Sequence, residues 1–207
     1  MTGSEPDDEL NPTRVYEEHT YHAAISGYNP GQKKSLQEYA NLHAEDESLR
    51  RWKESLGIVP GAAPADANAP KLTIHKLALE SSVLPNGSLG IQLDRPGELE
   101  RLSKEPLQVP EGIEYSVMIR FSVGSEVLSG LKYIHVVRRA GMPVDRMEEM
   151  IGSYPPRNEP CEKRFAPSEA PSGFLARSGI NSVRSKVVDD DGTVYADFAW
   201  SFKLVKA

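Results

Sequence analysis

The sequence predicts an all-β fold: an immunoglobulin-like antiparallel β-sandwich, preceded by an N-terminal region with two short helices. After Lys71, hydrophobic and polar residues alternate with the period of two that is typical of strands with one buried face. Turns rich in Gly, Pro and Asp separate these segments, and about seven short strands at this spacing are typical of a sandwich. Cys161 is the only cysteine, so the disulfide that many such domains contain cannot form.

The charge of the chain is concentrated at its N-terminus. The formal net charge is -6, and residues 1–30 contain six acidic residues against one base, Arg14. These residues have few periodic apolar positions, so we expect an acidic disordered tail over residues 1–30. The rest of the chain is close to neutral and lacks the clustered Lys and Arg of a nucleic-acid-binding face. No apolar run approaches the ~20 residues of a membrane span, and no secretory signal is recognisable, so we expect a cytoplasmic protein.

Residues 31–60 predict two short helices. Ser35 can cap the first helix, because Glu38 lies three residues further on and completes a capping box. Asp46 can cap the second helix. Helices of roughly ten residues are marginal in water unless their apolar face finds a partner. The second helix has a narrow apolar stripe with helical spacing, formed by Leu49, Trp52 and Leu56.

A linker and a strand-rich region complete the chain. Residues 61–70, GAAPADANAP, have the composition of a linker. The sandwich is expected over residues 71–207, with its clearest alternation in 113–123 and 194–204. Weaker strand patterns occupy residues 72–79, 89–93, 127–137, 144–151 and 180–188.

The sequence contains little that resembles catalytic machinery, so we do not expect an enzyme, a metal or a cofactor. Asp189, Asp190 and Asp191 are consecutive carboxylates, but a calcium loop needs alternating ligands and a distant Glu, so a hairpin turn is the better interpretation. The five histidines show no HxH or HExxH spacing, and no glycine-rich phosphate loop or GxSxG motif occurs. A metal-dependent hydrolase built around the three Asp remains the weakest alternative.

Several local stretches resemble the Rho GDP-dissociation inhibitors. They follow one another in the order and spacing of that family between about Tyr28 and Leu204. The stretches are QKKSLQEYANLHAEDESLRRWKESLG, SGLKYIHVVRRAG, MIGSYPPR, EAPSGFLARSG, and SKVVDDDG followed by DFAWSFKL.

The resemblance implies a division of labour between the two parts of the chain. The sandwich of such a protein holds the geranylgeranyl or farnesyl group of a partner GTPase between its sheets. A flexible arm with the two short helices packs on the GTPase switch regions, where a weak helix can become ordered on its partner. The implied partners are prenylated Rho, Rac and Cdc42-type GTPases, mainly in the GDP-bound state, in a 1:1 complex. The implied function is to slow GDP release and to extract the GTPase from membranes.

The resemblance also implies an isoprenyl pocket. For each of its residues, ordinary sandwich core is an equally good interpretation. Leu107 and Phe198 stand where the family often has Phe and Trp, which puts the shape of the pocket and its preferred isoprenoid in question. The matching positions are Leu77, Leu79, Leu107, Tyr115, Val127, Leu131, Leu175, Val183, Phe198 and Trp200.

The residues implied to meet the GTPase lie in the arm and on an acidic rim. In the arm, Ser35 and Asp46 are also candidate helix N-caps, and both roles can hold at once. On the rim, negative charge near the pocket mouth would speed encounter with the basic segment that precedes the lipidated cysteine. The full set is Ser35, Asp46, Leu49, Trp52, Asp145, Asp189, Asp190 and Asp191. The alternative function is a more general prenyl- or acyl-binding solubilising factor, which would not depend on the arm.

Overall fold

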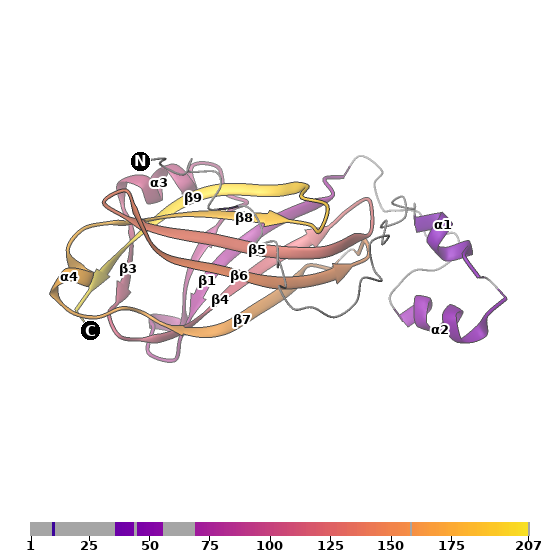
Figure 1. The fold of residues 1–207 in the computed structure, drawn as a ribbon, viewed down its shortest axis with the longest axis horizontal. Coiled ribbons are helices and arrows are strands. Elements are labelled where there is room, and N and C mark those ends of the chain that lie inside the picture. Colours follow the sequence, from indigo (N-terminus) through magenta and orange to yellow (C-terminus); the bar gives the residue numbers. More distant parts are fainter. Residues whose placement is uncertain (1–9, 11–35, 44, 56–68, 158, 207) are drawn as a thin grey trace, which may run out of the picture.

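The computed structural model describes residues 10, 36–43, 45–55, 69–157 and 159–206. Two sheets pack face to face over residues 72–205 (Figure 1). The four-stranded sheet has the order β2-β1-β4-β7, with β1 at Leu72–Glu80, β2 at Ser88–Gln92, β4 at Glu114–Val123 and β7 at Cys161–Glu169. The five-stranded sheet has the order β3-β9-β8-β5-β6, with β3 at Leu107–Pro110, β5 at Leu128–Arg139, β6 at Met142–Tyr154, β8 at Asn181–Val188 and β9 at Val194–Val205.

The predicted fold class is confirmed, but the structure adds two strands. Every pairing is antiparallel except that of β3 with β9, which is parallel. The strand β3 is only four residues long, and β7 is an edge strand in which Cys161 and Phe165 are the buried residues. Such short or edge strands have no regular alternation to reveal them. Two short helices, α3 (Glu98–Lys104) and α4 (Phe174–Arg177), were likewise not predicted.

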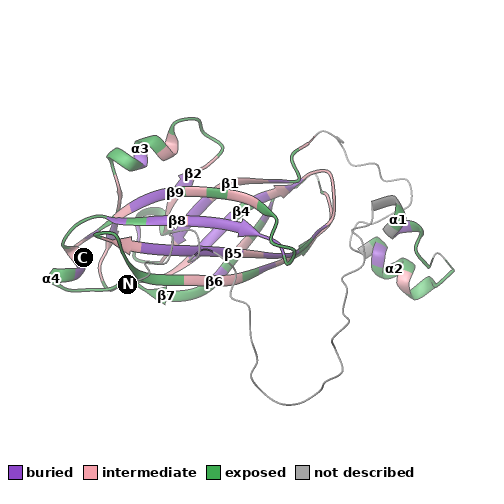
Figure 2. Cartoon of the chain, turned by 45° about the horizontal axis from the view of Figure 1, so that its top comes forward, coloured by how far each residue is buried: buried purple, intermediate pink, exposed green. Residues whose placement is uncertain are grey.

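The core lies between the two sheets, and its buried residues come from strands of both sheets (Figure 2). Aromatic contacts cross from one sheet to the other. Phe165 of β7 stacks on Tyr133 of β5 with ring centroids 5.2 Å apart, and Phe121 of β4 meets Tyr154 of β6 edge-on at 5.1 Å. Such pairs are worth about 0.5–1.5 kcal/mol beyond the burial of their area. They join the sheets toward one end of the sandwich.

The outer face of the five-stranded sheet also buries apolar residues. Ile134 and Val136 of β5 and Val188 of β8 form a small cluster there with Leu10 of the N-terminal region, which is only 2% exposed. The other predicted tail residues, most of the predicted linker, and Ser35 and Leu56 lie outside the described residues. The division of the chain at residues 30, 60 and 70 therefore stays a prediction, although the first described strand begins at Leu72.

The two predicted arm helices are α1 (Leu36–Asn41) and α2 (Glu47–Ser55), and they lie apart from the sandwich (Figure 1). Lys53 joins them, because its ammonium group donates hydrogen bonds to the carbonyl oxygens of Ala40 and Leu42. Burial of the Lys53 side chain between the helices leaves the opposite face of α2 for other contacts. None of the helices in the described ranges has the length and apolar character needed to cross a membrane.

A pair of glycine substitutions tests the packing at the edge of the sandwich. A Cβ at Gly124 would lie 2.2 Å from the backbone oxygen of Pro70, whereas one at Gly90 would meet only the flexible end of Lys76, 2.7 Å away. We expect Gly124→Ala to lower the free energy of unfolding by ~1–3 kcal/mol, because backbone must shift. Gly90→Ala should change it by less than about 0.5 kcal/mol. Urea unfolding of both variants measures the difference, and equal values would contradict the described packing.

Candidate functional site

A small apolar cavity lies between the sheets. Its walls come from β1 and β4 on one side, from β5 and β9 on the other, and from β3 and the segment after β7 at one end. Its volume is about 20 Å³, enough for roughly one water molecule. We call it the inner cavity; it is lined by Leu79, Val109, Tyr115, Val117, His135, Val137, Ala170, Pro171, Trp200, Phe202 and Leu204.

A larger and more polar space, which we call the mouth, adjoins the inner cavity. The two share Tyr115, Val137, Pro171 and Phe202, and the mouth has a volume of about 450 Å³. Ligand pockets in proteins start at ~300 Å³, so the mouth is of ligand size while the inner cavity is not. The residues that belong only to the mouth are Arg139, Val144, Asp145, Ser168, Glu169 and Asn181.

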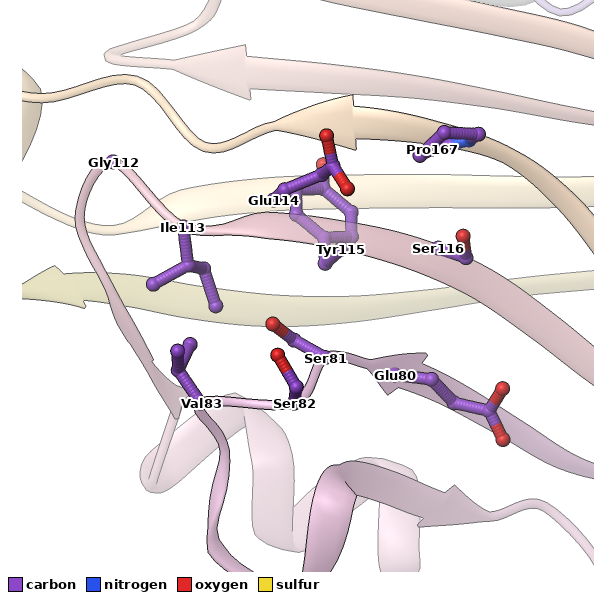
Figure 3. Close-up of a pocket in the computed structure, with 10 residues that line it drawn as sticks. All are labelled: Glu80, Ser81, Ser82, Val83, Gly112, Ile113, Glu114, Tyr115, Ser116 and Pro167. Carbon is purple, nitrogen blue, oxygen red and sulfur yellow. The ribbon is translucent and has the colours of Figure 1, made fainter.

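A third hollow, of about 310 Å³, lies where β1 ends and β4 begins (Figure 3). Its lining is largely polar, with the carboxylates of Glu80 and Glu114 and the hydroxyls of Ser81 and Ser82. The Glu80 carboxylate is already paired with Arg164 at 2.6 Å. An acidic and polar surface of this kind does not suit a hydrocarbon ligand. The inner cavity with its mouth is therefore the better candidate site.

A chain of hydrogen bonds fixes the wall of the inner cavity at Trp200. Its indole N–H donates to the Ser185 hydroxyl at 3.1 Å, and that hydroxyl lies 2.9 Å from the hydroxyl of Tyr133. The Tyr133 hydroxyl in turn lies 3.3 Å from Nδ1 of His135. A neutral His135 with Nδ1 unprotonated completes the chain, because Nδ1 then accepts. All four residues belong to the five-stranded sheet, so the chain does not depend on the opposite sheet.

Burial sets the ionisation of the groups around the cavity. Desolvation lowers the pKa of His135 to about 4, although the nearby charge of Asp145 opposes the shift. Burial, with a smaller contribution from Asp145, raises the pKa of Tyr115 above its usual value. Both residues are therefore neutral at physiological pH. Asp145 is exposed, and its charge contributes to the pKa shifts of both His135 and Tyr115.

Most of the predicted isoprenyl-binding residues come together, but two do not. Leu79, Tyr115 and Trp200 line the inner cavity. Val127 is half-buried and outside the core cluster, and Leu175 is 76% exposed on α4. The remaining predicted residues belong to the surrounding core or pack against it: Leu77, Leu107, Leu131, Val183 and Phe198. The assignment of the whole predicted set to lipid binding stays a prediction.

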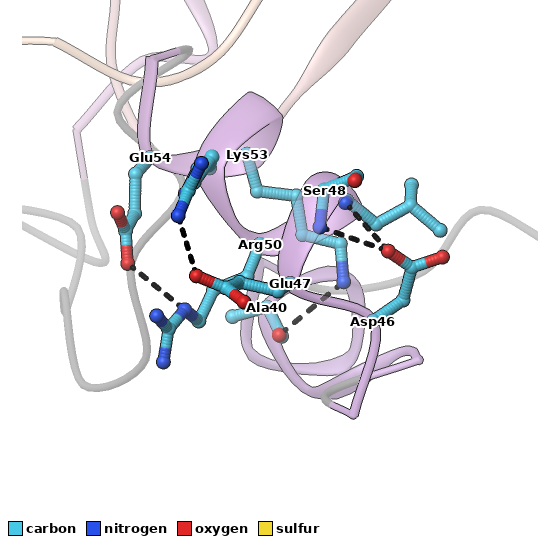
Figure 4. Close-up of polar contacts among 9 residues, drawn as sticks. Ala40, Asp46, Glu47, Ser48, Arg50, Lys53 and Glu54 are labelled. Atoms are coloured by element: carbon cyan, nitrogen blue, oxygen red, sulfur yellow. Dashed lines mark hydrogen bonds and ion pairs between the residues drawn. The ribbon is translucent and has the colours of Figure 1, made fainter.

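Of the predicted GTPase-binding residues of the arm, the structure describes Asp46, which directly precedes α2 (Figure 4), and Leu49 and Trp52, which lie within α2. Asp46 caps this helix, since its Oδ1 accepts hydrogen bonds from the backbone N–H groups of Ser48 at 2.9 Å and Leu49 at 3.1 Å. Leu49 is half-buried, and Trp52 is 58% exposed. A large aromatic surface of this kind is common at the centre of protein interfaces.

The structure separates the predicted acidic residues into two groups. Asp145 lies at the mouth, whereas Asp189, Asp190 and Asp191 follow β8 at the opposite end from Asn181. The length of β8 places the two groups roughly 25 Å apart, at ~3.3 Å per residue. Asp189 is buried, and its carboxylate accepts hydrogen bonds from the backbone N–H of Asp191 and Thr193 and from the Tyr195 hydroxyl. The exposed Asp190 pairs with Lys132 at 3.3 Å.

Several residues of the site were not singled out from the sequence. Val117, Phe202 and Leu204 share the inward alternation of Tyr115 and Trp200, so the period of two could have identified them. Val109, Ala170 and Pro171 come from β3 and the segment after β7, for which the sequence gives no signal. The polar mouth residues Arg139 and Asn181 face each other only through the pairing of β5 with β8.

A family model and several related sequences agree on one family. The family model described as "RHO protein GDP dissociation inhibitor" matches residues 13–207. The Rho GDP-dissociation inhibitor of Schizosaccharomyces pombe is 39% identical over 178 residues, covering 86% of this chain and 85% of that protein. Human Rho GDP-dissociation inhibitor 1 is 40% identical over 180 residues with the same coverage. The Saccharomyces cerevisiae protein is 35% identical, covering 86% of this chain and 90% of its own length.

The pH dependence of stability tests the burial of His135. Its pKa is lowered from 6.5 to about 4 by folding, so below pH 6.5 the unfolded state binds a proton that the folded state does not. The contribution of neutral His135 to the free energy of unfolding is therefore fully present above pH 6.5. It is lost as the pH is lowered toward 4, by up to ~3 kcal/mol. Replacement by Gln keeps a hydrogen-bond acceptor for Tyr133 and cannot titrate.

Urea unfolding of the wild type and His135→Gln at several pH values between 4 and 7 isolates this effect, because every carboxylate is common to both proteins. The gap between the two stabilities should change by up to ~3 kcal/mol in favour of the Gln variant as the pH falls. Parallel curves would show that His135 is protonated as easily in the folded protein as in the unfolded chain.

Proposed function

This chain belongs to the Rho GDP-dissociation inhibitor family, and from that premise we propose how it acts on a prenylated Rho-family GTPase. The sandwich binds the isoprenyl group between its sheets and so keeps the GTPase out of the membrane. The arm helices bind the switch regions and slow the release of GDP. The family is regulatory rather than catalytic, so the chain acts by binding.

The four lining residues that the inner cavity shares with the mouth support the lipid part of this proposal most strongly. The mouth gives access from solvent, and the apolar lining beyond it suits a hydrocarbon chain. Each buried CH₂ contributes ~0.8 kcal/mol, so a geranylgeranyl group of about 20 carbons offers on the order of 10 kcal/mol before the costs of opening. The inner cavity of about 20 Å³ must expand to accept it. The lipid then replaces contacts that the two sheets now make with each other.

The exposed face of α2 supports the part of the proposal that concerns the switch regions. Asp46 and the ion pair of Glu47 with Arg51 stabilise a helix that is otherwise short (Figure 4). Trp52, which is exposed, and the half-buried Leu49, whose backbone N–H donates to Asp46, then offer apolar contact area on this helix. At the mouth, the charges of Asp145 and Glu169 would orient the basic segment of the GTPase that precedes its lipidated cysteine.

Binding should depend on the lipid. The purified protein should remove a GDP-bound, prenylated Rho GTPase from liposomes, because the apolar interior offers the isoprenyl group an alternative to the bilayer. Sedimentation of the liposomes measures the fraction of GTPase released. The same GTPase without its prenyl group is the control for affinity in solution, and equal affinity for both forms would overturn the lipid-binding proposal.

Two substitutions of Asp46 separate its capping role from a contact with the GTPase. Asn is about as good an N-cap as Asp, so Asp46→Asn keeps the cap and removes the charge, whereas Asp46→Ala removes both at ~1 kcal/mol for the cap. If the charge meets the switch surface, both variants should bind a prenylated Rho GTPase at least ~10-fold more weakly, since such contacts can cost 2 kcal/mol or more. Titration of the three proteins decides between the roles. An Asn variant that binds like the wild type would restrict Asp46 to capping.

A further inference from the structure

Asn181 stands at the boundary between the mouth and the core. It is the first residue of β8 and pairs with Arg139 of β5 and Phe202 of β9. Val183, two residues further on, is part of the core between the sheets, so Asn181 faces the same interior space. Asn181 has no exposed surface, yet it is among the residues that line the mouth.

The orientation of the Asn181 amide is fixed by Arg139. The guanidinium Nε–H donates to Oδ1 of Asn181 at 3.0 Å. Arginine has only donors, so the oxygen of the amide must face it and the NH₂ group must point elsewhere. Arg139 is itself held at the mouth, because its Nη1 donates to the backbone oxygen of Leu175 at 3.3 Å.

The NH₂ group of Asn181 lacks a partner. Within the described ranges, Nδ2 of Asn181 is the one buried side-chain nitrogen or oxygen without a hydrogen bond. An apolar side chain at this place would avoid the cost of burying an unpaired donor. A ligand group that accepts a hydrogen bond from the NH₂ group would explain why Asn stands here. Because NH₂ is a donor, the missing group must be an acceptor such as a carbonyl oxygen.

We propose that Asn181 forms a carbonyl-binding subsite at the mouth, which accepts the carbonyl oxygen of the prenylated cysteine at the end of the partner chain. The inference rests on the proposed function, since it assumes that the isoprenyl group occupies the inner cavity. In such a ligand the carbonyl lies only a few bonds from the thioether that carries the lipid. With the lipid beyond Tyr115 and Phe202, this carbonyl falls in the mouth. Arg139 is the positioning residue, because it holds Oδ1 of Asn181 and so leaves the NH₂ group to find another acceptor.

The carbonyl has two chemical sources, a free α-carboxylate and its methyl ester. Both present an acceptor oxygen, and they differ in charge. The mouth contains one cation, Arg139, and two acidic residues, Asp145 and Glu169. The balance of charge therefore tends to oppose a free carboxylate more than a neutral ester. Three probe peptides separate the effect of the carbonyl oxygen from the effect of the charge.

The probes are fluorescein-labelled tetrapeptides that end in S-geranylgeranyl-cysteine methyl ester, in S-geranylgeranyl-cysteine with a free carboxylate, and in S-geranylgeranyl-cysteamine, which lacks the terminal carbonyl. Fluorescence anisotropy gives the Kd of each for the full chain. The wild type should bind at least one carbonyl form roughly five-fold more tightly than the cysteamine form, which is the effect of one net hydrogen bond. Asn181→Leu, which keeps the volume and removes the donor, should bind the methyl ester and the cysteamine form, both of which lack a terminal charge, within about two-fold of each other.

The outcomes separate this inference from the proposal on which it depends. If none of the three peptides binds the wild type, the lipid-binding proposal fails and the subsite fails with it. If all three bind the wild type equally well, lipid binding stands and the carbonyl subsite is overturned, as it would be if a bound water already completes the amide. Retention of the carbonyl preference by Asn181→Leu would also overturn it. The comparison within the wild type needs no variant, so it holds even if Asn181→Leu does not fold.

Discussion

The close fit between the inner faces of the two sheets is the constraint on which the rest of the structure depends. Toward one end of the sandwich, the aromatic pairs Phe121–Tyr154 and Tyr133–Phe165 join the sheets. Toward the other, the fit loosens into the inner cavity and then into the mouth. A core that was equally tight throughout could not admit a lipid without unfolding. The graded packing lets one end hold the fold while the other end opens.

The hydrogen-bonded side chains beside the inner cavity all belong to one of the two sheets. Trp200, Ser185, Tyr133 and His135 are joined by hydrogen bonds within the five-stranded sheet. Separation of the sheets at the mouth would therefore leave these bonds intact and keep Trp200 in its orientation. Leu79 and Val117, on the opposite wall, belong to the four-stranded sheet and have only apolar contacts to lose. When the sheets separate, the apolar contacts between them are lost, and apolar contacts with the lipid can replace them.

The sequence predicts the parts of this design that depend on local pattern. The alternation from Tyr115 to Phe121, and again around Trp200, identifies the inward-facing residues, and the sequence around Asp46 is enough to recognise it as a helix cap. The short strand β3 and the edge strand β7 have no such pattern, so Val109 and Ala170 could not be assigned to the cavity. The meeting of Arg139 with Asn181 depends on strand register, which local sequence does not encode. The separation of Asp145 from Asp189 also follows from strand length and direction rather than from any motif.

Photo-crosslinking tests the central claim, that the isoprenyl group lies between the sheets, most directly. A prenylated cysteine peptide with a benzophenone at the end of its isoprenyl chain would be bound, irradiated and mapped by mass spectrometry. The account predicts adducts on residues of the inner cavity and the adjoining core, such as Leu79, Val117 and Trp200, which are only 3–6% exposed and come from both sheets. Adducts confined to exposed positions, such as Phe174 and Leu175 on α4, would show that the lipid binds on the surface and would contradict the account.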